Sequence, residues 1–209
     1  MKKENTLYLA LNDSTIAYPN RTALLYMHKK ITYKSLLENV HRLSQGLISY
    51  GIKKDDVVSV CLPNIPSAVH LLYAINQNGA IANLIHPLMK YEQMKIIMEE
   101  TGSRLLFALD TAYQEFLPLN DIGVRVIACS PVSGLNPFFI AGYSFQNCSK
   151  IKKIKKSDKI KSFYSKTQLF SYDNDIKKDA FYLHSGGTTG KPKVVALSSY
   201  SVNALAANV

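Results

Sequence analysis

The sequence has no tryptophan, only three cysteines and four arginines, and no long apolar run. Cys61, Cys129 and Cys148 are too few and too scattered for a disulfide framework or a zinc site, and they fit a reducing, cytoplasmic setting. No apolar stretch approaches the roughly 18 residues of a membrane span, and the short apolar stretch after Lys2 and Lys3 does not favour a secretory signal. Because 47% of the 209 residues are hydrophobic, the chain can form a sizeable core.

The formal net charge of +10 is concentrated in one segment. Residues 150–178 hold ten lysines and three aspartates, and seven of these lysines lie within residues 150–161. Such a run can bind nucleic acid or an anionic membrane surface, but it contains no arginine for bidentate phosphate contacts. Its isoleucines are too sparse for a strong amphipathic face, which favours a solvated linker. We expect no nucleic-acid partner, and a basic interaction module for nucleic acid or a membrane surface stays as an alternative.

Apolar periodicity predicts alternating helices and strands over the first 130 residues. Helices are expected over residues 6–17, 33–50, 67–78, 90–101 and 111–117, with a hairpin strand at 22–27. Continuous apolar runs predict buried strands over residues 57–62, 80–85, 104–109 and 124–129. This alternation predicts right-handed crossovers and an α/β fold, with a largely parallel sheet flanked by helices.

The alternation is lost between residues 131 and 178, where proline, glycine, serine, asparagine and lysine are frequent. We predict three parts of the chain. Residues 1–130 form an α/β N-terminal subdomain, and residues 131–178 form a loop-rich basic insertion or linker. Residues 179–209 form a strand, a loop, a second strand and the start of a helix, which together make an incomplete domain.

The residues that suggest chemistry lie in the loop SGGTTGKPK, residues 185–193, between the apolar stretches AFYLH and VVAL of a predicted hairpin. Its glycines let backbone N–H groups approach an anion, its hydroxyls are donors, and its lysines carry positive charge. The loop therefore suits a polyphosphate. The candidate phosphate-binding residues are Ser185, Gly186, Gly187, Thr188, Thr189, Gly190, Lys191 and Lys193.

Two other interpretations of this loop are weaker. An ordinary glycine-rich turn rarely needs three hydroxyl residues and two lysines together. The P-loop pattern G-x-x-x-x-G-K-[ST] fails because Ser185 stands at its first glycine and Pro192 follows Lys191. His184, next to the loop, is expected to be a neutral residue at the end of a strand. We predict no catalytic triad, no metal site and no catalytic residue within this chain.

The loop resembles the phosphate-binding loop of the adenylate-forming superfamily of acyl-CoA synthetases, luciferases and peptide-synthetase adenylation domains. Residues 31–87 are similar to the opening segment of that family, with a T-Y-x-x-L helix followed by P-N and G-A, and residues 89–108 are similar to its next helix and strand. The sequence departs from the family where Asp55-Asp56 replaces Gly-Asp, where Val194-Val195 follows Lys193, and at Ser198-Ser199-Tyr200.

The resemblance implies an acid–thiol ligase that uses ATP, Mg²⁺ and coenzyme A. Such an enzyme forms an acyl-adenylate from a carboxylic acid and then an acyl-CoA. Residues 185–191 would wrap the β- and γ-phosphates, and Lys193 would support the same charge. The doubled glycine favours fatty or acyl acids, so the resemblance indicates a fatty-acid or acyl-CoA ligase.

The chain stops where the family continues with the elements that hold adenine, ribose and the acyl group. We therefore expect the N-terminal part of a longer enzyme, which alone forms no acyl-adenylate and whose truncated sheet favours self-association. A non-catalytic nucleotide- or phosphate-binding module is the alternative, and sequence beyond Val209 would distinguish the two.

Overall fold

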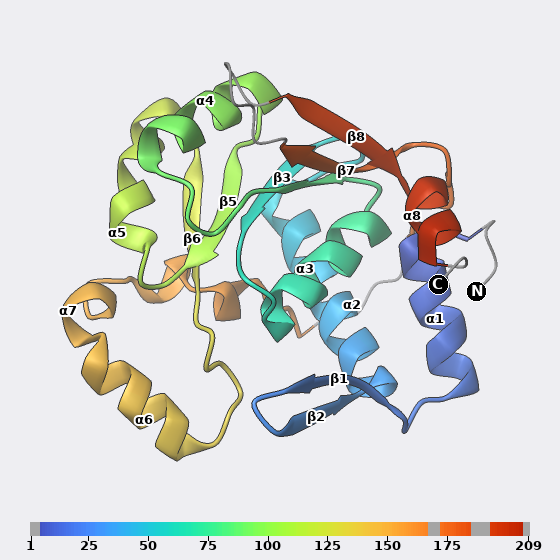
Figure 1. Cartoon of the computed structure of the whole chain (residues 1–209), viewed down its shortest axis with the longest axis horizontal. Helices are drawn as coiled ribbons and strands as arrows, with labels where there is room; N and C mark the ends of the chain where they lie inside the picture. Colours follow the sequence, from blue (N-terminus) through green and yellow to red (C-terminus); the bar gives the residue numbers. More distant parts are fainter. Residues whose placement is uncertain (1–4, 167–171, 185–192, 207–209) are drawn as a thin grey trace.

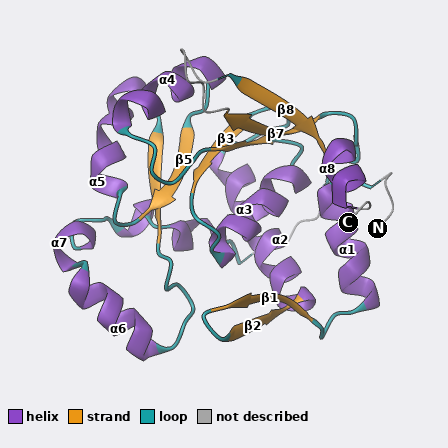
Figure 2. Cartoon of the chain, viewed as in Figure 1, coloured by secondary structure: helices purple, strands orange, loops and turns teal. Residues whose placement is uncertain are grey.

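A six-stranded sheet with helices on both faces is the centre of the computed structural model (Figures 1 and 2). The structure describes residues 5–166, 172–184 and 193–206. Its strands are β1 (Thr22–Tyr26), β2 (Lys29–Thr32), β3 (Val57–Cys61), β4 (Ile81–Leu84), β5 (Leu105–Leu109), β6 (Arg125–Cys129), β7 (Asp179–His184) and β8 (Val194–Ser198). Its α-helices are α1 (Leu7–Ala17), α2 (Tyr33–Tyr50), α3 (Pro66–Gln77), α4 (Tyr91–Thr101), α5 (Tyr113–Phe116), α6 (Pro137–Gln146), α7 (Cys148–Ile151) and α8 (Ser199–Ala206). The 3-10 helices are η1 (Leu117–Ile122), η2 (Lys156–Asp158) and η3 (Ile160–Phe163).

The predicted α/β fold with a largely parallel sheet is confirmed. The strand order is β6-β5-β3-β4-β7-β8, and all neighbours are parallel except β7 and β8, which pair antiparallel. β1 and β2 form a separate hairpin beside α2, as Figure 1 shows. The crossover helices cover the sheet, so its central strands are continuous apolar runs rather than alternating ones.

The two faces of the sheet have separate apolar cores. On one face, Val60 of β3 and Phe107 of β5 pack in a cluster with Leu43 of α2. On the other face, Leu106 of β5 belongs to a cluster with Met94 of α4. Successive residues of a strand point to opposite faces, which explains why neighbours such as Leu106 and Phe107 belong to different cores.

Local signals in the sequence explain where α2 begins and ends. The Thr32 hydroxyl accepts a hydrogen bond from the Ser35 N–H at 3.2 Å, so it caps the first turn. Gly51 follows the last turn with φ of 103°, a left-handed conformation that a residue without Cβ adopts without strain. An apolar stripe between these two ends is buried against the sheet.

The described part of residues 131–178 contains more helix and more buried side chains than the sequence suggested. It includes α6, α7, η2 and η3, and Ile154, Ile160 and Phe163 are buried, with 6%, 2% and 5% of their surface exposed. The expectation that the isoleucines of the basic run lie in a solvated linker is therefore wrong for Ile154 and Ile160. Ile160 follows Ile154 by six positions, and the two enter different apolar clusters, so no helical periodicity marks them. The division into domains stays a prediction.

The end of this segment packs directly on α2. A Cβ atom on Gly46 of α2 would lie 1.7 Å from the carbonyl oxygen of Phe163, so the two backbones touch at this glycine. The Arg42 Nε donates to the Ser165 carbonyl at 3.0 Å, and the Tyr164 hydroxyl and His70 Nδ1 of α3 are 2.8 Å apart. These contacts attach the connection between β6 and β7 to both α2 and α3.

Two thiols, Cys61 and Cys129, are buried, and Cys148 is exposed. In the described part of the chain, no group of three His, Cys, Asp or Glu side chains is placed to hold a metal ion. None of the helices within the described ranges has the length and apolarity that a bilayer crossing requires.

We predict that Gly46→Ala destabilises the fold by about 3 kcal/mol or more, because the new methyl group would overlap the Phe163 backbone. Gly142→Ala is the matched control, since a Cβ at this α6 position meets nothing within 4 Å. Alanine exceeds glycine in helix propensity by about 1 kcal/mol, so the control should be neutral or more stable. Urea unfolding of both variants measures the difference, and equal stabilities would contradict the close approach of α2 and η3.

Candidate functional site

The predicted phosphate loop joins two strands that pair in the structure. β7 and β8 form an antiparallel hairpin whose last pair is His184 with Val194, as predicted for the stretches around the loop. Seven of the eight predicted site residues, Ser185 to Lys191, lie outside the described residues. Lys193 is described, and it is exposed immediately before β8. The hairpin thus holds both ends of the loop at one edge of the sheet.

The position of the loop in the fold is typical of ligand sites in α/β proteins. β7 is parallel to β4, with Asn83 opposite Tyr182, so the loop leaves the sheet at the carboxyl end of a parallel strand. Ligands of open α/β sheets bind in the crevice outside these carboxyl ends. β8, the edge strand, then returns antiparallel along β7 (Figure 1).

A buried chain of polar side chains runs from the root of the loop into the sheet. His184 Nε2 lies 2.6 Å from the Asn83 oxygen, and the Asn83 amide nitrogen donates to Ser59 Oγ at 2.9 Å. The Ser59 hydroxyl donates to Ser103 Oγ at 2.9 Å, and the Ser103 hydroxyl donates to the Leu105 carbonyl at 3.2 Å. Ser59, Asn83 and Ser103 are at most 1% exposed, so this chain links β7, β4, β3 and the start of β5 inside the core.

The direction of these hydrogen bonds determines the tautomer of His184. The Asn83 amide group uses its nitrogen toward Ser59, so its oxygen accepts, and His184 Nε2 is the protonated nitrogen. The other ring nitrogen, Nδ1, is buried without a hydrogen-bond partner in the described structure. Neutral His184 therefore presents an acceptor beside the loop.

Burial lowers the pKa of His184 below its ordinary value, and the charge of Glu100 opposes the shift in part. His184 is consequently neutral at pH 7, in line with the expectation for a histidine at a strand end. A neutral acceptor does not bind a phosphate oxygen. It can accept a hydrogen bond from an N–H or hydroxyl group, which suits a role in holding the loop rather than the anion.

A second set of hydrogen bonds fixes the far end of β8 and the start of α8. Ser198 Oγ accepts from the Ser201 N–H at 3.2 Å, so this serine caps the first turn of the helix. The buried Asn76 of α3 donates to Ser199 Oγ at 3.1 Å and accepts from the Tyr8 N–H at 2.9 Å. The hairpin is thus attached to α3 and α1 as well as to β4.

The pattern of apolar residues did not reveal Asn83 or Ser59. Both lie inside runs that predict buried strands, AIANLI and VVSVCL, and each interrupts its run with a single polar residue. A buried polar side chain is tolerated only with hydrogen-bond partners, so these interruptions were the available signal. Because Ser59 is opposite Asn83 in the parallel register, the two polar residues that interrupt the runs lie side by side.

Comparisons with known proteins identify the family of the chain. The family model "AMP-binding enzyme" matches residues 12–209. The chain belongs to this family of AMP-binding, adenylate-forming enzymes, as the loop and the opening segment indicated. It is 28% identical to the long-chain-fatty-acid–CoA ligase of Bacillus subtilis over 207 residues, which cover 94% of the chain and 37% of that ligase.

Solved structures share the fold. A long-chain-fatty-acid–CoA ligase from Archaeoglobus fulgidus superimposes with a TM-score of 0.77 and 22% identity, over 99% of the chain and 39% of that protein. The acetoacetyl-CoA synthetase of Streptomyces lividans has a TM-score of 0.75 and 20% identity, over 94% of the chain and 31% of that protein. The chain spans less than half the length of each of these relatives.

We predict that Asn83→Ala destabilises the protein by about 2 kcal/mol, because it removes the acceptor of the His184 N–H and the amide donor to the Ser59 oxygen inside the core. Ser162→Ala is the control, since the exposed Ser162 hydroxyl donates only to nearby backbone carbonyls and water replaces those bonds. Chemical denaturation measures both. A loss of stability no larger for Asn83→Ala than for Ser162→Ala would rule out a stabilising role for the polar chain.

Proposed function

We propose that residues 185–193 bind the β- and γ-phosphates of ATP in an ATP-dependent carboxylic acid–CoA ligase. In this proposal the chain supplies the phosphate-binding part of an enzyme that forms an acyl-adenylate and pyrophosphate, and then an acyl-CoA. The observation that carries it is the β7–β8 hairpin, which brings both ends of a glycine-, hydroxyl- and lysine-rich loop to the carboxyl end of a parallel strand.

The chemistry of the loop supports a polyphosphate. Backbone N–H groups at Gly186, Gly187 and Gly190 can approach phosphate oxygens without hindrance from a Cβ. Lys191 and Lys193 neutralise charge that grows on the leaving pyrophosphate. None of these groups is a nucleophile in the proposal, because adenylation joins the acid to the α-phosphorus and leaves pyrophosphate to be stabilised.

The described residues support a rigid base for this loop. The acceptor Nδ1 of His184 is buried and unpartnered in the described structure, and a donor from the neighbouring loop would satisfy it. His184 is in turn held by Asn83 through the buried polar chain. In this proposal His184 and Asn83 position the loop, and the loop binds the phosphates.

The cofactors and substrates are part of the same proposal. Mg²⁺ would enter bound to ATP, because magnesium sites commonly combine substrate phosphates with few protein ligands and the described residues offer no three-ligand cluster. Coenzyme A would accept the acyl group. The doubled glycine of the loop favours a fatty or other aliphatic acid over an aryl acid.

We predict that Lys191→Ala weakens binding of ATP to the chain by about tenfold or more, since a hydrogen bond to a charged group contributes about 1.5–3 kcal/mol. Isothermal titration calorimetry with ATP and with pyrophosphate measures the loss. Lys177→Ala is the control, because Lys177 is an exposed lysine before β7 and outside the loop. Equal affinities for the two variants would refute the role of Lys191.

A second prediction concerns the reaction. A chain that spans 37% of its Bacillus relative should bind ATP but show no carboxylate-dependent exchange of pyrophosphate into ATP. The prediction assumes that the remaining catalytic groups lie outside these 209 residues. Pyrophosphate exchange by the 209-residue chain would show that this assumption is wrong. If a version extended beyond Val209 also bound ATP without exchange, the non-catalytic phosphate-binding module would replace the ligase.

A further inference from the structure

A polar cavity lies away from the phosphate loop, on the face of the sheet that α2 and α3 cover. Its volume is about 590 Å³, and it is bounded by the β1–β2 hairpin, α2, the first turn of α3, residues 133–135 and the segment that includes Lys161 and Tyr164. No residue of β7 or β8 lines it. Cavities of roughly 300–1,000 Å³ are the usual size of small-molecule sites.

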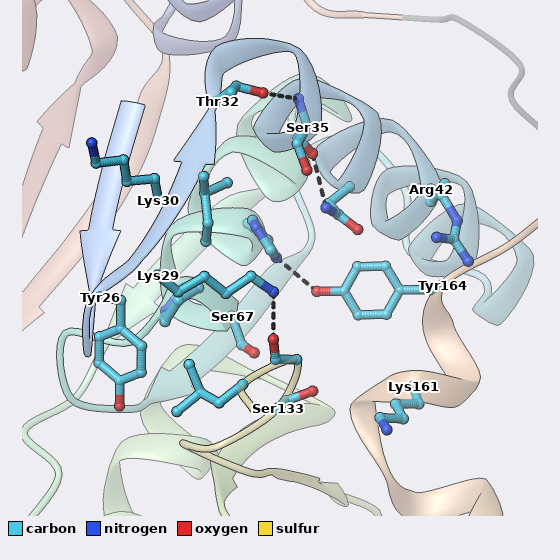
Figure 3. Close-up of a pocket in the computed structure, with 16 residues that line it drawn as sticks. Tyr26, Lys29, Lys30, Thr32, Ser35, Arg42, Ser67, Ser133, Lys161 and Tyr164 are labelled. Atoms are coloured by element: carbon cyan, nitrogen blue, oxygen red, sulfur yellow. Dashed lines mark hydrogen bonds between the residues drawn. The ribbon is translucent and has the colours of Figure 1, made fainter. Parts of the chain in front are cut away.

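The cavity is strongly cationic. Its lining includes Lys29, Lys30, Arg42 and Lys161 and no aspartate or glutamate. Within the described ranges, none of these four cations forms an ion pair with a carboxylate. In Figure 3, Lys29 and Lys161 extend toward the space below Tyr164, whereas Lys30 points away from it. Neighbouring residues of a strand point to opposite sides, which explains the different directions of Lys29 and Lys30.

The cationic side chains are held in place by contacts within the protein. The Lys29 ammonium donates to the Gly134 carbonyl, which uses one of its three hydrogens. The Arg42 guanidinium carbon lies 5.7 Å from the centre of the Tyr164 ring while its Nε donates to Ser165. This organisation lowers the entropy that these two side chains lose when an anion binds.

Neutral donors complete the lining. Burial raises the pKa of Tyr164 well above its usual value, so its hydroxyl keeps its proton. An interaction with the Ser67 side chain lowers the pKa of Tyr164 only in part. The phenol oxygen and His70 Nδ1 are 2.8 Å apart, so the two groups share one hydrogen bond.

His70 supplies an independent sign of a missing partner. It lines the cavity, it is 93% buried because only 7% of its surface is exposed, and its Nε2 has no hydrogen-bond partner in the described structure. Burial, with the charge of Lys29, lowers its pKa to about 4, so it is neutral at physiological pH. A buried polar nitrogen without a partner is unfavourable, and a ligand in the cavity or its bound water would supply one.

The first turn of α3 adds to the positive potential. α3 spans 12 residues and begins with Pro66, and no side chain caps its N-terminus. Pro66 and Ser67 both line the cavity. The amide groups of a helix N-terminus carry a partial positive charge, which favours an anion at this end.

We propose that this cavity binds a small organic phosphate monoester. Lys29, Arg42 and Lys161 line the cavity, and their positive charges suit the charge of about −1.5 to −2 that a phosphate monoester carries at neutral pH. A volume of about 590 Å³ exceeds what inorganic phosphate fills, so the ligand carries an organic group as well. Ser35, Asn39 and Thr32 line the other side and offer hydrogen bonds to hydroxyl groups of that part.

The test uses ribose 5-phosphate as the probe and ribose as the uncharged control. Titrations are made on the unaltered 209-residue chain and on variants that all carry Lys191→Ala and Lys193→Ala, so that the phosphate loop does not contribute in the variants. We expect Lys29→Gln and Lys161→Gln each to weaken binding of ribose 5-phosphate by about tenfold. Lys30→Gln is the matched control, because it removes the same charge from the neighbouring residue of the same strand, and we expect less than a threefold effect, the size that screening of a distant charge produces.

Chemical shifts of the backbone amides locate the site. Ribose 5-phosphate should shift Ser35, Ser67 and Ser133, which line the cavity, whereas ribose should shift none of them. Absence of binding at millimolar concentration, or equal losses with Lys29→Gln and Lys30→Gln, would overturn the proposal. Binding that appears only when the phosphate loop is unaltered would assign the anion to that loop and would equally overturn it.

Discussion

The parallel pairing of β4 with β7 is the constraint on which the candidate site depends. Asn83 and Tyr182 are opposite each other in the sheet although 98 residues separate them in the chain, so β5, β6 and the long connection must close a loop between them. The cost of closing such a loop rises slowly with its length, which permits a long connection. The register is what matters. A shift by one residue would turn His184 to the other face and leave Asn83 as an unpaired amide in the core.

The polar chain from His184 to Leu105 stabilises this register of β4 and β7 relative to other registers. Each member donates to the next, so all of the hydrogen bonds have the same direction and end at a backbone carbonyl. An alternative register would lose several bonds at once, because a buried donor has no water to replace its partner. Among the side chains of this polar chain, the one buried atom without a hydrogen-bond partner in the described structure is Nδ1 of His184, next to the loop. The core of the sheet therefore determines the position and the tautomer of the residue next to the loop.

Apolar patterns were sufficient to predict most elements of the first 130 residues, because α2 buries an apolar stripe and the central strands are continuous apolar runs. It could not predict contacts whose partners are far apart in sequence. Gly46 has no signal of its own within an amphipathic helix, and its importance comes from the Phe163 carbonyl 117 residues later. Asn83 and Ser59 did interrupt their apolar runs, but only the strand order shows that they meet. The hairpin around the loop was predictable, since its strands adjoin in sequence and need no distant partner.

The lysine-rich run shows why net charge is a poor guide to a surface. In the sequence, residues 150–161 form one basic block, but the fold places its lysines on different parts of the surface. Ile154 and Ile160 are buried in clusters on opposite faces of the sheet, and Asp158 between them pairs with Arg125 at 3.3 Å. Lys161 lines the cationic cavity, whereas Lys153 and Lys155 border a different hollow near α5. Buried apolar residues thus set where each lysine of the run lies, and neighbouring charges in the sequence belong to separate parts of the surface. An extended polyanion, which needs one continuous basic stripe, fits this arrangement less well than small anions that contact two or three cations at a time.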